Sequence, residues 1–123
     1  MAESGGLPEP IAHSVDLLVE SLSGLEVLIA LYRDVERSWS AAEIACLLRI
    51  TPRAALHELE RLNAHGVAER GTYGGEPIFC YCPADPAQAA HVARIATAYA
   101  TRRIETINHV ASSTLRRIRP GSP

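Results

Sequence analysis

The stretch from Ser40 to Pro83 constrains the fold more than any other part of the chain. Ser40 and Glu43 have the spacing of a capping box, which begins a helix by pairing each side chain with the other residue's backbone N–H. After a connection long enough only for a turn, Thr51 caps a second helix, and Pro52 takes its first position, where no N–H is needed. Apolar residues recur at helical spacing in both helices: Ile44, Ala45 and Leu48, then Ala55, Leu56, Leu59 and Leu62.

A β-hairpin is predicted directly after the second helix. Gly66 is placed to end that helix in a left-handed conformation. Strands are expected over 67–72 and 77–82, with the turn at Gly74 and Gly75, because glycine readily adopts the positive φ angles of hairpin turns. The predicted order from 40 to 83 is therefore helix, turn, helix and hairpin.

The segment TPRAALHELERLNAHGVAERGTYGGEPIFCY resembles the recognition helix and wing of winged helix-turn-helix transcriptional regulators of the broad MarR and ArsR type. The resemblance covers residues 23–83. It implies a mainly α fold with a small β-hairpin wing, in which residues 11–83 form the DNA-binding domain with its N-terminal helix. It also implies a bacterial, sequence-specific regulator that binds double-stranded DNA as a homodimer and most often represses transcription.

Arg53, His57 and Arg61 lie at i, i+4 and i+8 of the second helix, opposite its apolar stripe. By the resemblance this side enters the major groove and the wing approaches the backbone or the minor groove. The alternative is that it is the solvated face of an amphipathic helix. The expected DNA contacts are Ser40, Thr51, Pro52, Arg53, Ala54, His57 and Arg61 in the helices, and Arg70, Tyr73, Gly74 and Gly75 in the wing.

Charge is distributed unevenly along the 123 residues, whose formal net charge is −2. Residues 1–48 hold eight acidic residues and two arginines, residues 49–84 hold four of each, and residues 85–123 hold six arginines and two acidic residues. The chain thus lacks the overall basic charge that is typical of nucleic-acid binders. This favours a second hypothesis, in which a winged-helix module uses its acidic first half to bind another regulator or the transcription machinery.

Residues 1–10 are small, polar and proline-containing, and we expect a disordered lead-in. A short amphipathic helix is predicted from Ile11 to Leu22. Ser23 and Glu26 have capping-box spacing, which predicts the start of a further helix that ends near Arg37.

The chain from 84 to 119 is predicted to form one long helix, followed by a tail over 120–123. Asp85 caps this helix, Pro86 takes its first position, and no proline or glycine interrupts it. About 33 residues would span roughly 50 Å, which is longer than a domain of this size. A break near Arg102 and Arg103 is the alternative.

The apolar residues of this helix alternate at three- and four-residue steps, as in a helical bundle. We therefore expect a homodimer in which the long helix packs against its copy, together with the helix over 11–22, to which the resemblance also implies an interface role. The expected interface comprises Val15, Leu18, Leu22, Ala96, Ala100, Ile104, Ile107, Ala111 and Leu115.

The sequence predicts neither an enzyme nor a bound cofactor, because no nucleophile has a base at a recognisable spacing and no glycine-rich loop could hold phosphate. The five histidines show no metal-ligand spacing. Cys46, Cys80 and Cys82 could form a metal site or a redox switch, although buried cysteines that act as small apolar residues are more common. No signal peptide or membrane span is recognisable, so we expect a cytoplasmic protein.

Overall fold

The computed structural model describes residues 6–118, with side chains to Leu115. The described part contains six helices and three strands: α1 (Glu9–Leu18), α2 (Leu22–Arg33), β1 (Trp39–Ser40), α3 (Ala41–Leu48), α4 (Pro52–Ala64), β2 (Ala68–Tyr73), β3 (Glu76–Tyr81), α5 (Pro86–Thr101) and α6 (Arg103–Ile118). The predicted fold class, mainly α with a small β wing, is confirmed. None of the helices in this part combines the length and apolar character needed to cross a membrane.

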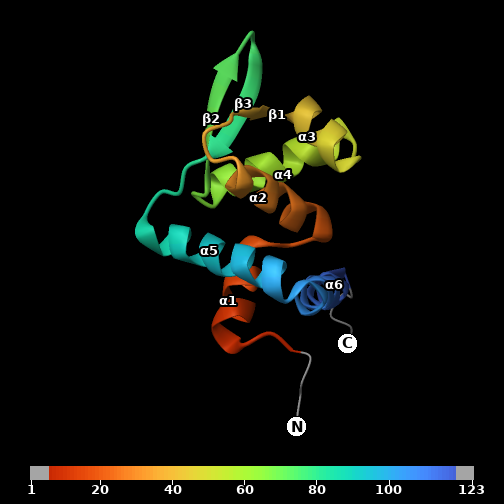
Figure 1. Ribbon diagram of the computed structural model, residues 1–123. Coiled ribbons are helices and arrows are strands. Elements are labelled where there is room, and N and C mark those ends of the chain that lie inside the picture. The colour runs from red at the N-terminus through yellow and green to blue at the C-terminus, as the bar shows by residue number, and fades with distance from the viewer. Residues whose placement is uncertain (1–5, 119–123) are drawn as a thin grey trace.

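The helices form two layers with α2 between them (Figure 1). The strands, α3 and α4 lie on one side of α2, and α1, α5 and α6 lie on the other. Val27, Leu28 and Leu31 of α2 have no exposed surface, because both layers pack on this helix. One apolar core therefore runs from Val15 of α1 to Phe79 of β3.

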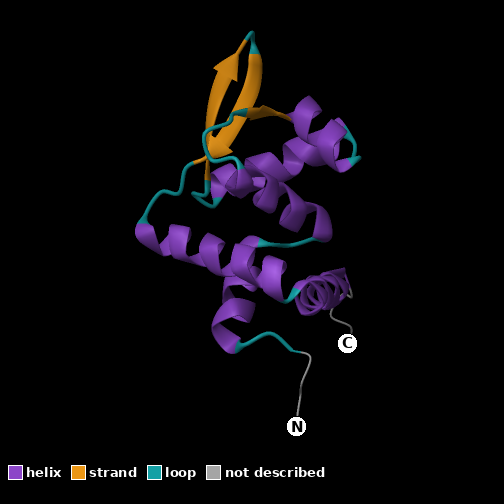
Figure 2. Cartoon of the chain, viewed as in Figure 1, coloured by secondary structure: helices purple, strands orange, loops and turns teal. Residues whose placement is uncertain are grey.

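The sheet is antiparallel and has the strand order β1-β3-β2 (Figure 2). The sequence predicted β2 and β3, with bounds that differ by one residue, and it missed the two-residue strand β1. Trp39 of β1 pairs with Phe79, and Gly74 and Gly75 form the hairpin turn with φ angles of 61° and 82°. Ser40 ends β1 and also caps α3, so the predicted capping box with Glu43 is confirmed.

The predicted bounds of the first two helices were wrong. α1 ends at Leu18 rather than Leu22, and α2 is capped by Ser21 rather than Ser23. The Ser21 hydroxyl accepts the backbone N–H of Gly24 at 3.0 Å and donates to a carboxylate of α4, a long-range partner that explains which serine becomes the cap. α2 ends at Arg33, earlier than predicted.

The prediction of a single C-terminal helix is also wrong. The helix breaks at Arg102, where φ is −136° and ψ is 53°. Figure 1 shows α6 running across the line of α5. The break falls where the alternative placed it, and it lets Val92 and Ile95 of α5 and Val110 of α6 reach the same core.

The predicted lead-in over 1–10 extends too far, since Leu7 packs against the core and α1 begins at Glu9. Its first five residues lie outside the described part of the chain. The predicted end of the last helix at Arg119 and the tail over 120–123 also lie outside it.

Replacing Phe79 with alanine should lower the free energy of unfolding by about 3–5 kcal/mol, because this side chain is fully buried where the sheet meets the helices. Urea unfolding followed by circular dichroism measures the change. Thr72→Ala, on the exposed strand β2, is the control and should cost about 1 kcal/mol or less. Equal losses in the two variants would contradict this assignment of the core.

Candidate nucleic-acid interface

The turn between α3 and α4 is tight and exposes the start of α4. Arg49 ends α3 in the left-handed conformation, with a φ angle of 62°, and the Ile50 N–H donates back to the carbonyl of Ala45 at 3.1 Å. Thr51 then caps α4 by accepting the N–H of Ala54 at 3.0 Å, and Pro52 takes the first position, as predicted. The free N–H groups of this helix end carry partial positive charge, which favours bound anions.

Two basic side chains of α4, Arg53 and His57, are exposed beside this end. Thr51 and Pro52 are exposed as well, whereas Ala54 is half-buried. Sequence reasoning passed over Arg49, an exposed residue in the turn directly before α4. The position of Arg49 between the two helices of a helix-turn-helix pattern could have predicted that it belongs to this interface.

Ser40 and Arg61 do not lie on this exposed face, which corrects their predicted place among the DNA contacts. Ser40 is buried, and its hydroxyl is held in the capping box. Arg61 turns inward, with only 11 % of its side chain exposed. At 100° per residue His57 lies about 40° around α4 from Arg53, but Arg61 lies about 80° around, which brings it to the edge that packs on α2.

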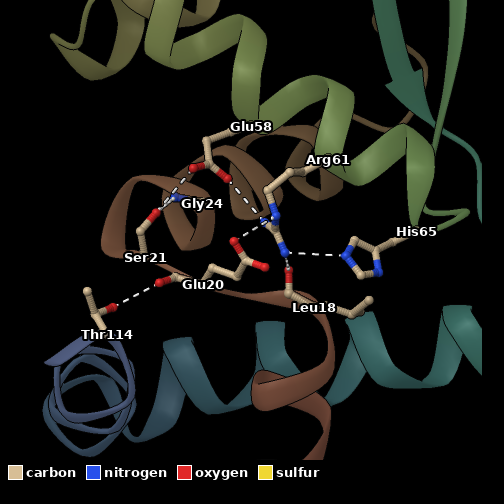
Figure 3. Close-up of polar contacts among 8 residues, drawn as sticks. All are labelled: Leu18, Glu20, Ser21, Gly24, Glu58, Arg61, His65 and Thr114. Carbon is tan, nitrogen blue, oxygen red and sulfur yellow. Dashed lines mark hydrogen bonds and ion pairs between the residues drawn. The ribbon is translucent and has the colours of Figure 1, made fainter. Parts of the chain in front are cut away.

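Arg61 is the centre of a polar cluster that joins α4 to the segment between α1 and α2 (Figure 3). Its Nε lies 3.2 Å from Glu20 Oε1, its Nη1 lies 3.2 Å from Glu58 Oε1, and its Nη2 donates to the carbonyl of Leu18 at 3.4 Å. His65 lies 3.4 Å from the same Nη2. We call these five residues together with Ser21 the Arg61 cluster.

The wing projects into solvent. Tyr73 is 78 % exposed at its tip, and Arg70, Gly74 and Gly75 are exposed beside it. The guanidinium of Arg70 lies 6.0 Å from the ring centre of Phe79. The wing residues predicted from the sequence are therefore accessible.

All three cysteines are free thiols. Cys46 and Cys82 are exposed, so the expectation of buried cysteines is wrong for both. Partial desolvation raises the pKa of the Cys82 thiol, and the neighbouring carboxylate of Glu69 raises this pKa further. A redox-sensing cysteine has a lowered pKa, so Cys82 lacks the usual chemistry of a redox switch. Within residues 6–118, no three His, Cys, Asp or Glu side chains are grouped to hold a metal ion.

The predicted dimer residues fall into two groups. Val15 and Leu18 are buried in the core of the single chain, so their predicted interface role is wrong. Leu22 at the start of α2 is 42 % exposed, and Ile104 and Leu115 are 69 % and 64 % exposed because α6 buries a different face against the core. The remaining predicted residues are exposed or half-buried: Ala96, Ala100, Ile107 and Ala111.

An open hollow of about 500 Å³ lies where α2, α3 and the α5–α6 junction meet. Arg33, Trp39, Tyr99 and Arg103 are among the residues that line it. Trp39 Nε1 is the one buried side-chain polar atom that lacks a hydrogen-bond partner among the described residues. Because Trp39 is the only tryptophan of the chain, its fluorescence can report changes around the hollow.

The sequence matches no protein-family model, and no curated protein sequence matches it significantly. Solved structures match the fold. The YusO protein from Bacillus subtilis has a TM-score of 0.55 and 16 % identity, over 87 % of this chain and 80 % of that chain. RV1404 from Mycobacterium tuberculosis has a TM-score of 0.52 and 16 % identity, over 93 % and 86 %. An ArsR-like transcriptional regulator from Rhodococcus sp. RHA1 has a TM-score of 0.48 and 20 % identity, over 91 % and 95 %.

The order α3, turn, α4 and β2–β3 hairpin, with β1 completing the three-stranded sheet, is a winged-helix fold. At 16 % identity the likeness to YusO and RV1404 concerns the arrangement of the elements alone.

Gly24→Ala should destabilise the protein by about 1–3 kcal/mol, because an added Cβ would lie 2.8 Å from Glu58 Oε1. Glu58 is buried and held by Arg61 and Ser21, so it has little freedom to move away. Thermal unfolding measures the effect. Gly71→Ala, whose Cβ would lie 3.6 Å from Ile78, is the matched control. If both variants melt at the wild-type temperature, Gly24 does not pack against Glu58 in this way.

Glu69→Gln should speed alkylation of Cys82 by iodoacetamide about threefold at pH 8, because removing the carboxylate lowers the raised thiol pKa and increases the thiolate fraction. Peptide mass spectrometry measures the rate at each cysteine. Cys46, which is exposed on α3, provides the internal control and should react at the same rate in both proteins. An unchanged or slower rate at Cys82 would show that Glu69 does not raise its pKa.

Proposed function

We propose that this protein is a sequence-specific, DNA-binding transcriptional regulator that reads DNA with the N-terminal half of α4. The observation that carries the proposal is the exposed basic group formed by Arg49, Arg53 and His57 around the capped start of this helix. A helix-turn-helix presents this part of its second helix to the base edges of the major groove.

Each of these groups has a distinct task in the proposed complex. The guanidinium of Arg53 has the fork of donors that pairs with guanine O6 and N7, so it would provide base readout. Arg49 and the N–H groups at the start of α4 would bind phosphates, which positions the helix without reading sequence. Arg70 and Tyr73 of the exposed wing would add contacts to the backbone.

The proposed regulator is a homodimer that acts as a repressor by covering a promoter. The support for a second subunit is the exposed apolar surface of α6, where Ile104 and Leu115 face solvent in the single chain. Pairing along this face would bury it and present two α4 helices to half-sites about 34 Å apart.

Arg53→Ala should weaken binding to the fragment upstream of its own gene about 10- to 100-fold, because a bidentate arginine–guanine contact is worth about 1–3 kcal/mol. Fluorescence anisotropy measures affinity, with random duplex as the reference and salt varied from about 50 to 200 mM. Arg94→Ala, an exposed arginine on α5, is the matched control and should bind as the wild type does. Equal affinity of wild type and Arg53→Ala for both duplexes would contradict specific readout by Arg53.

A second candidate is a module that binds a protein partner. It is favoured by the balance of charge on the same surface, where Arg49, Arg53 and Arg70 are matched by exposed Glu60, Glu69 and Glu76. The two candidates differ in one outcome: a folded dimer that binds no duplex even at low salt would favour the protein partner.

A further inference from the structure

We propose that Arg61 is a positioning residue that couples the candidate recognition helix α4 to α6 through the segment between α1 and α2. This inference rests on the proposed function and names a determinant of its specificity. The α5–α6 layer would thereby set the orientation of α4 in each subunit, and with it the half-site spacing that the dimer accepts.

The first half of the connection runs from α4 to the α1–α2 segment. Arg61 contacts the side chain of Glu20 in this segment at 3.2 Å and the carbonyl of Leu18, the last residue of α1, at 3.4 Å. The guanidinium is planar and its donors have fixed directions, so two contacts from one group define an orientation as well as a distance. The Arg61 side chain is 11 % exposed and the Glu20 side chain 51 %, so solvent screens this ion pair from the Glu20 side.

The second half runs from the same segment to α6. The hydroxyl of Thr114 lies 2.8 Å from the backbone carbonyl of Glu20 (Figure 3) and 2.9 Å from that of Val110 in its own helix, and it can donate its one proton to either. Glu20 is therefore contacted through its side chain by α4 and through its backbone by α6. A further contact, between His109 of α6 and Asp16 of α1 at 2.8 Å, holds the two helices of that layer together.

A third set of contacts fixes the start of α2 in the same cluster. Ser21 donates to Glu58 Oε2 at 3.3 Å while it caps α2, so the carboxylate that pairs with Arg61 also holds the helix between the two layers. α4 itself packs broadly on α2, α3 and β2. The Arg61 cluster thus adds a directional polar link from α4 to α1 and α6, which apolar packing alone does not supply.

The test uses substitutions that leave the core intact. Glu20→Gln removes the charge of a half-exposed side chain, and Thr114→Val removes the hydroxyl that reaches Glu20. Glu26→Gln is the matched control, because Glu26 is exposed on α2 and its side chain has no hydrogen bond or ion pair among the side chains described, which end at Leu115. After footprinting of the wild-type site, each protein is titrated with a two-half-site duplex, with versions whose spacing differs by one base pair, and with a single half-site.

Glu20→Gln and Thr114→Val should each lose about tenfold in affinity for the wild-type spacing and discriminate less between spacings. Both should bind the single half-site as the wild type does, since the reading surface is untouched. The double variant should lose no more than the larger single loss, because both changes interrupt one connection. Equal losses on the single half-site, or no loss on either duplex, would overturn the positioning role.

The failure of the proposed function has a different signature, in which the wild-type protein binds no duplex. Hydrogen exchange of the free protein then decides the inference. Glu20→Gln should speed exchange in the C-terminal half of α4 and in the α1–α2 segment together, whereas Glu26→Gln should leave both unchanged. Wild-type exchange rates in Glu20→Gln would overturn the coupling in either case.

Discussion

The pairing of the Arg61 guanidinium with Glu20 and Glu58 is the polar interaction that joins α4 to the segment between α1 and α2, beside the apolar core that both layers share. Glu58 is buried, and a buried carboxylate is costly unless a cation and hydrogen bonds satisfy it. Arg61 supplies the cation, and Arg61 and Ser21 donate the hydrogen bonds to Glu58. The need to satisfy this carboxylate constrains how α4, the α1–α2 segment and α2 meet. The absence of a side chain at Gly24 leaves room for the carboxylate. The Arg61–Glu58 ion pair, the Ser21 cap of α2 and Gly24 therefore depend on one another at this contact.

The inward position of Arg61 determines which part of α4 is available to a partner. One of the two arginines of this helix is occupied in the cluster, so the exposed basic charge concentrates at the helix start with Arg49 and Arg53. A surface with so few cations would gain little from counterion release. The proposed regulator would consequently depend on base contacts and on correct spacing of two subunits more than on general attraction to phosphate. Because base contacts and subunit spacing both require a defined position of α4, the orientation of this helix would determine the affinity of the proposed regulator for DNA.

The sequence predicted those features that are decided within a few residues. The capping box of Ser40 and Glu43, the Thr51–Pro52 start of α4 and the glycine turn of the wing each depend on local spacing. The missed features depend on contacts between distant segments. Ser21 becomes the cap of α2 because Glu58 accepts its hydroxyl, and the last helix breaks at Arg102 because its two parts pack on one core. Arg61 shares helical spacing with Arg53, yet Glu20, 41 positions earlier in the sequence, draws it inward.

In the proposed complex the start of α4, and not its Arg61 end, contacts DNA. Amide hydrogen exchange of the full chain, free and bound to its footprinted duplex, distinguishes the two ends of the helix. New protection is expected over residues 49–57 and over the wing residues 70–76, with no change around Arg61 and His65 beyond that seen with random duplex. Protection confined to other surfaces, such as the acidic residues of α1 and α2, would show that the start of α4 does not contact DNA. The winged-helix surface would then be free for a protein partner.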